Sequence, residues 1–150
     1  MNRKRIAIAV VALVVLVVGI SVYAQVKRPY RNGTVWSISF IRMKPGMDTA
    51  YLDYVAGQWK AEQEAQKKAG NILSYKVLAV EGHTSAEWNL MLMTESKDLA
   101  TLEATEDKAD NVAQKVVGND EKQRQGYRER EAIREVVGTR LAREIILEPK

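Results

Sequence analysis

The stretch from residue 34 to residue 70 constrains the fold most, because it encodes a strand, a tight turn and a long helix in direct succession. Residues 34–41 alternate as a β-strand does, with these large apolar side chains on one face: Trp36, Ile38 and Phe40. The segment Lys44-Pro45-Gly46-Met47 predicts a turn. Asp48 is expected to cap the helix that follows, and Gly70 to end it. Such a unit predicts an amphipathic helix laid on a sheet.

The rest of the chain predicts more strands and helices. Alternating apolar patterns place further strands at residues 71–81, 87–95 and 139–147. One helical region follows a Ser96 or Asp98 cap and ends at Gly118; a second, charge-balanced one covers residues 120–135 and ends at Gly138. The order β-α-β-β-α-α-β predicts an α+β fold. Its four-stranded antiparallel sheet carries helices on one face, which is the split βαβ arrangement.

The predicted strands are apolar on both faces, although helices in this fold cover only one face of the sheet. In the third strand Trp88, Leu90 and Leu92 alternate with Asn89, Met91 and Met93. A sheet that is apolar on both sides needs a cover on both sides. No residues remain for a second layer, so the economical cover is a second copy packed face to face. The sequence therefore predicts a homodimer.

The N-terminal segment reads as a secretory signal peptide spanning residues 1–24. A basic start is followed by an unbroken apolar run over residues 6–20 and by small residues before a cleavage position after Ala24. Residues 25–33 then form a linker, and residues 34–150 form the domain. We expect a periplasmic location, with residues 6–20 as an uncleaved membrane anchor as the alternative.

Charge and cysteine content exclude several classes of function. Three of the 23 basic residues lie in the predicted signal, which leaves 20 basic and 19 acidic side chains in the remainder. A nearly neutral domain lacks the concentrated positive field that nucleic acids require, so we expect no nucleic-acid partner. The chain has no cysteine. This excludes disulfides, a lipid-modified N-terminus and metal–thiolate sites.

The strand that leads into Lys44-Pro45-Gly46-Met47, with Trp59 late in the first helix, resembles the dimeric α/β-barrel superfamily. The resemblance covers roughly residues 33–147. It implies that two ferredoxin-like sheets pair as a barrel in a homodimer. The group includes cofactor-independent oxygenases, haem-dependent relatives and small-molecule lyases, so the resemblance implies a fold rather than one activity.

A candidate ligand pocket follows from polar side chains on otherwise apolar strands. These are Ser37, Ser39, Asn89 and Arg143, with Tyr75 among the nearest aromatic residues. The alternative is that the serines bond across the dimer and that Arg143 pairs with an acid at the rim. In the oxygenases of the resembling group, an Asn and a Trp near the pocket assist catalysis. Asn89 and Trp88 are adjacent here and point to opposite faces of a strand, which argues against that activity.

Other chemistry finds little support in the sequence. His83 is the sole histidine and lies in a predicted turn, so we expect no haem and no metal site. On a helical projection, Glu62 falls near the middle of the apolar face of the first helix. Either it is a buried carboxylate with a raised pKa, or it lies where the helix extends beyond the edge of the sheet. No phosphate loop or serine-nucleophile motif is present. We expect no cofactor, and the sequence assigns no catalytic residue.

The sequence thus favours an exported homodimeric α/β-barrel protein that binds a small apolar or aromatic molecule or serves as a non-catalytic envelope protein. Two alternatives remain open. One is a cofactor-independent monooxygenase-like enzyme that uses the barrel pocket. The other is a membrane-tethered module that binds a partner through the charged helix at residues 120–135.

Overall fold

The computed structural model describes residues 28–81 and 87–149, in two compact units. The main unit comprises Asn32–Ile146. In the smaller unit, the backbone N–H of Glu148 donates a hydrogen bond to the carbonyl of Pro29 over 2.9 Å. The predicted signal over residues 1–24, residues 25–27 of the predicted linker and His83 lie outside the described residues. No helix within the described ranges is long and apolar enough to cross a membrane.

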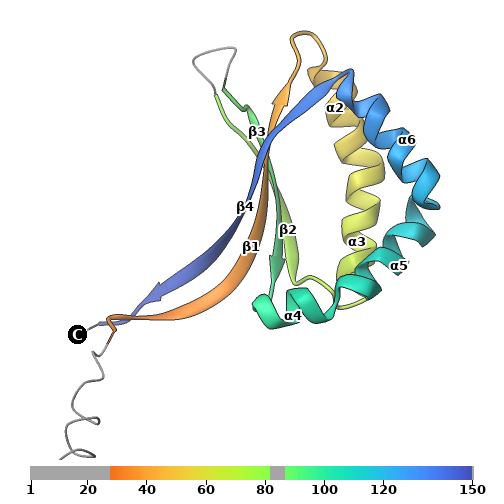
Figure 1. Cartoon of the computed structure of the whole chain (residues 1–150). Coiled ribbons are helices and arrows are strands. Elements are labelled where there is room, and N and C mark those ends of the chain that lie inside the picture. Colours follow the sequence, from red (N-terminus) through yellow and green to blue (C-terminus); the bar gives the residue numbers. More distant parts are fainter. Residues whose placement is uncertain (1–27, 82–86, 150) are drawn as a thin grey trace, which may run out of the picture. The chain divides into compact units, whose positions relative to one another are not determined.

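The chain forms a four-stranded antiparallel sheet with helices on one face (Figure 1). The strands are β1 (Tyr30–Met43), β2 (Ser74–Ala79), β3 (Leu90–Ser96) and β4 (Arg134–Leu147). The helical segments are α2 (Asp48–Tyr54), η1 (Val55–Trp59), α3 (Lys60–Lys68), α4 (Leu99–Ala104), α5 (Glu106–Val116) and α6 (Asp120–Glu131). The sheet order β2-β3-β1-β4 confirms the predicted ferredoxin-like arrangement.

The turn between β1 and α2 positions the first helix. The N–H of Met47 donates to the carbonyl of Lys44 over 2.9 Å, and Gly46 adopts a φ of 76°. The helix begins at Asp48, with Met47 in the N-cap position and no side-chain cap. The predicted Asp48 cap is therefore wrong, because the turn brings the helix start one residue earlier. The Asp48 carboxylate instead lies in the first turn, where it complements the helix dipole.

Strand β4 begins earlier than predicted. The sequence placed its start at residue 139 behind a helix that Gly138 ends, whereas α6 ends at Glu131 and Gly138 lies within β4. Pairing with β1 begins where the N–H of Lys44 donates to the carbonyl of Ile133 over 3.0 Å. Val136 also packs against the core from this strand. Cross-strand bonding and burial thus override the helical continuation that the sequence favoured.

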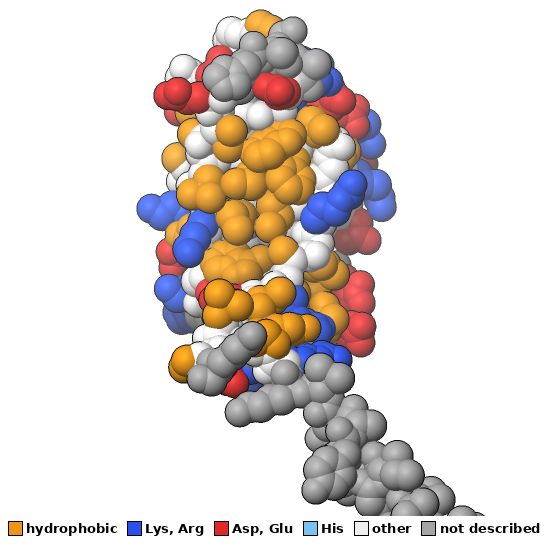
Figure 2. Space-filling model, turned by 90° about the vertical axis from the view of Figure 1, so that its left-hand side faces the viewer, with side chains coloured by type: hydrophobic (Ala, Val, Ile, Leu, Met, Phe, Trp, Pro, Cys, Tyr) orange, Lys and Arg blue, Asp and Glu red, His pale blue; other side chains and the backbone are white. Residues whose placement is uncertain are grey.

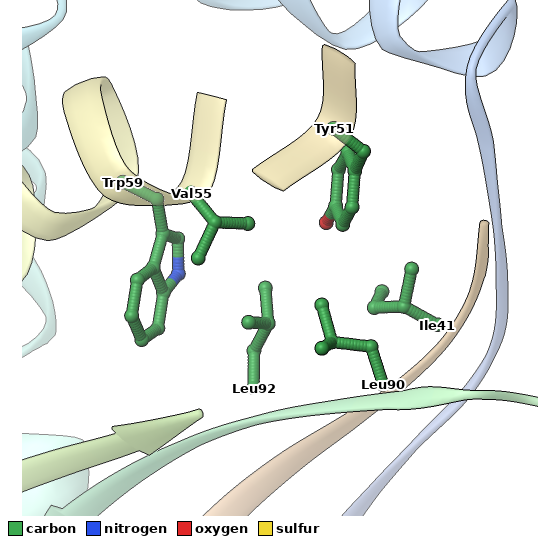
Figure 3. Packing of buried hydrophobic residues seen from close by; sticks show 6 residues of the cluster. All are labelled: Ile41, Tyr51, Val55, Trp59, Leu90 and Leu92. Carbon is green, nitrogen blue, oxygen red and sulfur yellow. The ribbon is translucent and has the colours of Figure 1, made fainter. Parts of the chain in front are cut away.

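The core lies between the sheet and the first helical segment. Tyr51, Val55 and Trp59 point from α2 and η1 toward Ile41 of β1 and toward two β3 residues, Leu90 and Leu92 (Figure 3). These three helix residues are spaced by four positions. In a continuous α-helix each such step overshoots one face by about 40°. The wider π-helical turns of η1 offset this drift, so all three side chains face the sheet.

The opposite face of the sheet carries no helix among the described elements (Figure 1). The register between β1 and β3 places Ile38 beside Met93 and Phe40 beside Met91, and Leu78 of β2 continues the row. Figure 2 shows a continuous field of hydrophobic side chains on this face, with lysine and arginine side chains at its edges. We call this surface the open face.

Candidate functional site

A cleft of about 480 Å³ lies on the helix-covered side of the sheet, between β1, β3 and the segments α3, α4 and α5. Its floor is formed by Ser37 and Thr94, which are direct partners in the β1–β3 register. Their hydroxyl groups replace the large apolar side chains found further along both strands. The floor is therefore polar where the helices leave a gap. The volume is within the usual range for a small-molecule site.

One wall of the cleft is a glutamine pair on α3. Gln63 and Gln66 are only 7% and 6% exposed. The amide nitrogen of Gln66 donates to the carbonyl of Ala109 over 2.8 Å, and its oxygen accepts from Asn71 over 2.7 Å. Gln66 thus ties α3 to α5 and to the chain that enters β2. Gln63 lines the same cleft, but its side chain takes no part in any hydrogen bond within the described residues.

The opposite wall is acidic. It contributes Glu103 at the end of α4 and two residues of α5, Glu106 and Asp110. The start of α4 is fixed by Asp98, whose carboxylate accepts a hydrogen bond from the N–H of Thr101 over 2.7 Å. This confirms one of the two predicted caps. The same bond lowers the pKa of Asp98, because it stabilises the ionised carboxylate.

Glu62 lines this cleft and also lines a second hollow, together with Tyr54 and Arg130. Burial raises the pKa of the Glu62 carboxyl group, and the positive charge of Arg130 partly offsets this rise. The Arg130 guanidinium lies 4.3 Å from the centre of the Tyr54 ring. Burial also raises the pKa of Tyr54. A carboxyl group with a raised pKa can exchange a proton with a bound molecule, which is the acid–base chemistry that this cleft offers.

The structure does not bring the five predicted site residues together. Ser37 lines the cleft, whereas Ser39 lies further along the same face of β1. The hydroxyl of Tyr75 donates to Glu64, and its ring packs edge-on against Trp59 with 5.4 Å between ring centres.

The other two predicted residues lie elsewhere. The side-chain oxygen of Asn89 accepts from the backbone N–H of Met43 over 2.9 Å, so this amide supports the junction of β1 and β3. Arg143 is exposed on β4.

The cleft residues that the sequence missed have two separate causes. A straight helical projection places Glu62 mid-face and Gln63 off the face. The π-helical segment η1 turns everything after it by about one residue, or roughly 100°. Gln63 is consequently buried, and Glu62 is only half-buried at the rim. The acidic wall carried no sequence signal, because it depends on how α4 and α5 fold back over the sheet.

A smaller hollow of about 300 Å³ opens on the open face. It is lined by Phe40, Trp88, Val137, Gly138 and Arg140. The Phe40 and Trp88 rings meet edge to face, with 4.7 Å between their centres. No group of three His, Cys, Asp or Glu side chains in residues 28–81 and 87–149 is arranged to hold a metal ion.

No protein-family model matches the chain, and no curated protein matches it. Among solved structures, the chain is similar to a dimeric ferredoxin-like protein from an uncultured marine organism. The two share 11% sequence identity and superimpose with a TM-score of 0.49, over 80% of this chain and 100% of the other. The sheet order β2-β3-β1-β4 of this chain identifies the fold without that likeness.

Proposed function

We propose that the protein is a homodimer in which the open faces of two sheets pair as a barrel. The observation that carries this proposal is the apolar character of the open face. Trp36, Ile38 and Phe40 of β1 share that face with two methionines of β3. Covering a side chain of this size contributes about 1.5–3 kcal/mol. A two-fold axis lets the same surface serve both partners, as dimers commonly require.

The lengths of the strands support a second copy as the cover. β1 and β4 each have 14 residues, whereas β2 has 6 and β3 has 7. Within the main unit, part of the β1–β4 pair therefore extends past the shorter strands as a two-stranded ribbon (Figure 1). On β4, Leu141 and Ile145 are 57% and 56% exposed. Two-stranded ribbons are marginally stable alone, so a partner surface that covers these residues stabilises the ribbon.

Within this dimer we propose that the hollow beside Phe40 and Trp88 binds a small apolar or aromatic molecule. Pairing of the sheets would enclose this hollow on the side where the isolated chain leaves it open. Edge-to-face and stacked aromatic contacts favour a flat ring in such a place. The predicted export of the chain fits a role outside the cytoplasm and is part of the same proposal.

The dimer is tested by light scattering on the full chain across a dilution series, with two neighbouring β2 residues as a matched pair. Leu78 lies on the open face and is 41% exposed, whereas Val77 points to the helix side and is 38% exposed. We expect Leu78→Lys to weaken dimerisation about ten- to a hundredfold, since it removes a buried Leu and adds a charge. Val77→Lys should leave the dimer intact. A wild-type monomer at all concentrations, or equal effects of the two changes, would refute the proposed pairing.

The ligand proposal is tested by titrating 2-naphthol into the dimer and measuring heat. Saturable binding of one molecule per chain is expected. Val137→Trp fills the hollow and should abolish this binding without changing the mass of the dimer. Uptake that never saturates, or that survives Val137→Trp, would contradict the ligand proposal and leave the dimer standing.

A further inference from the structure

The cleft between the sheet and α3–α5 has a strongly one-sided charge. Its lining includes four carboxylic acids and neither lysine nor arginine. These acids are Glu62, Glu103, Glu106 and Asp110. Neither ion pair found in the described part of the chain involves any of them, and the one nearby positive charge noted above is that of Arg130 beside Glu62. Like charges that share one concave surface raise the local concentration of cations there.

A buried, unpartnered amide also faces this cleft. Gln63 is 7% exposed and lines the cleft, and its side chain forms no hydrogen bond within the described residues. The described side-chain polar atoms that are fully enclosed without a partner belong to Arg130 and Arg134 instead. Because Gln63 lines the cleft and its polar side-chain atoms are not fully enclosed, the amide has access to that space. A buried amide without a protein partner is costly unless something in that space bonds to it.

The floor of the cleft adds hydroxyl groups. Ser37 and Thr94 lie side by side there, and neither hydroxyl is used in a hydrogen bond within residues 28–81 and 87–149. Hydroxyl and amide oxygens accept hydrogen bonds from N–H donors. Ile72, Leu102 and Ala109 line the rest of the cleft, and their apolar side chains suit methylene groups. The cleft thus offers acceptors, negative charge and apolar surface together.

From this combination we propose that the cleft binds a small aliphatic amine with two or more ammonium groups. Ammonium groups supply N–H donors to the Gln63 amide and the floor hydroxyls, and they neutralise the acidic wall. A bare metal ion does not fit, because no three acidic side chains in the described ranges converge on one point. The site lies within one chain and on the helix side, so it is distinct from the aromatic hollow and does not require the dimer.

Calorimetric titration of the full chain with 1,4-diaminobutane tests the proposal. 1,4-Butanediol and succinate serve as neutral and anionic probes of similar length. We expect one diamine to bind per chain, with an affinity that falls as salt is added, and no binding of the other two probes. Asp110→Asn on the cleft wall should weaken binding about three- to tenfold. Asp107→Asn is the matched control, because Asp107 lies on the same helix but outside the cleft.

Three results would overturn the proposal. The first is that butanediol binds as well as the diamine does. The second is that Asp107→Asn and Asp110→Asn reduce the affinity equally, which indicates attraction to the whole acidic surface. The third is that Gln63→Leu leaves the affinity unchanged. Repeating the titration with the Leu78→Lys variant separates this site from the dimer, since the affinity should not change there.

Discussion

Gln66 and Gln63 are a natural matched pair for measuring what holds the cleft in shape. Both lie on α3, three residues apart, with nearly the same burial. Their side chains differ in bonding, because the Gln66 amide donates to Ala109 and accepts from Asn71, whereas the Gln63 side chain forms no hydrogen bond with a described residue. Replacing each by Leu keeps the approximate volume and removes the amide. The two substitutions therefore separate the loss of hydrogen bonds from the loss of a polar group.

The expected cost of Gln66→Leu follows from the groups it leaves behind. The Asn71 amide nitrogen becomes a buried donor without its partner, which costs about 1–3 kcal/mol. The Ala109 carbonyl loses one hydrogen bond, worth about 0.5–1.5 kcal/mol net. Together these predict that Gln66→Leu lowers the free energy of unfolding by about 2–4 kcal/mol. Gln63→Leu leaves no other group without its hydrogen-bond partner, so it should change the free energy of unfolding by less than about 1 kcal/mol.

Urea unfolding, followed by circular dichroism, measures both variants. With a slope of about 2 kcal/mol per molar urea for a domain of this size, Gln66→Leu should lower the midpoint by about 1–2 M. The midpoint of Gln63→Leu should stay close to that of the wild type. Equal losses for the two variants would refute the reasoning, because burial rather than hydrogen bonding would then decide the cost.

Three further predictions concern the ends and the rim of this region. Burial raises the pKa of Glu62. The contribution of this carboxyl group to stability therefore falls as pH rises from the usual glutamate pKa through the raised value. We expect Glu62→Gln to flatten the pH dependence of the melting temperature above pH 4.5. Asp98→Ala should lower the melting temperature at pH 7, because the ionised Asp98 carboxylate caps α4. In strong acid the difference from the wild type should disappear, since the carboxylate is then protonated despite its lowered pKa. Gly70→Ala should cost about 1–2 kcal/mol in thermal unfolding because φ is 76°. Gly57→Ala, in a helical segment with open space around it, should instead stabilise the protein by about 0.5–1 kcal/mol.

The residues that begin and end the helices show which boundaries can be predicted from local sequence. Gly70 ends the first helix and Asp98 caps α4, as predicted. Gly70 acts through its own positive φ, and Asp98 through a hydrogen bond to Thr101, three residues later, so both signals are local. Asp48 does not cap its helix, since the preceding turn uses Met47 in that position. The start of β4 was also misplaced. Its residues have helical neighbours in sequence and gain a strand partner only when β1 lies beside them.

The sequence by itself determined the alternation of the strands and the order of the elements, and with them the sheet topology and the apolar open face. These depend on side-chain periodicity, which is local. Tertiary structure alone decided the cleft. The π-helical segment η1 rotates α3 so that Gln63 is buried and Glu62 lies at the rim, and the folding back of α4 and α5 supplies the acidic wall. Those positions depend on packing against residues far away in the chain, which no local pattern encodes.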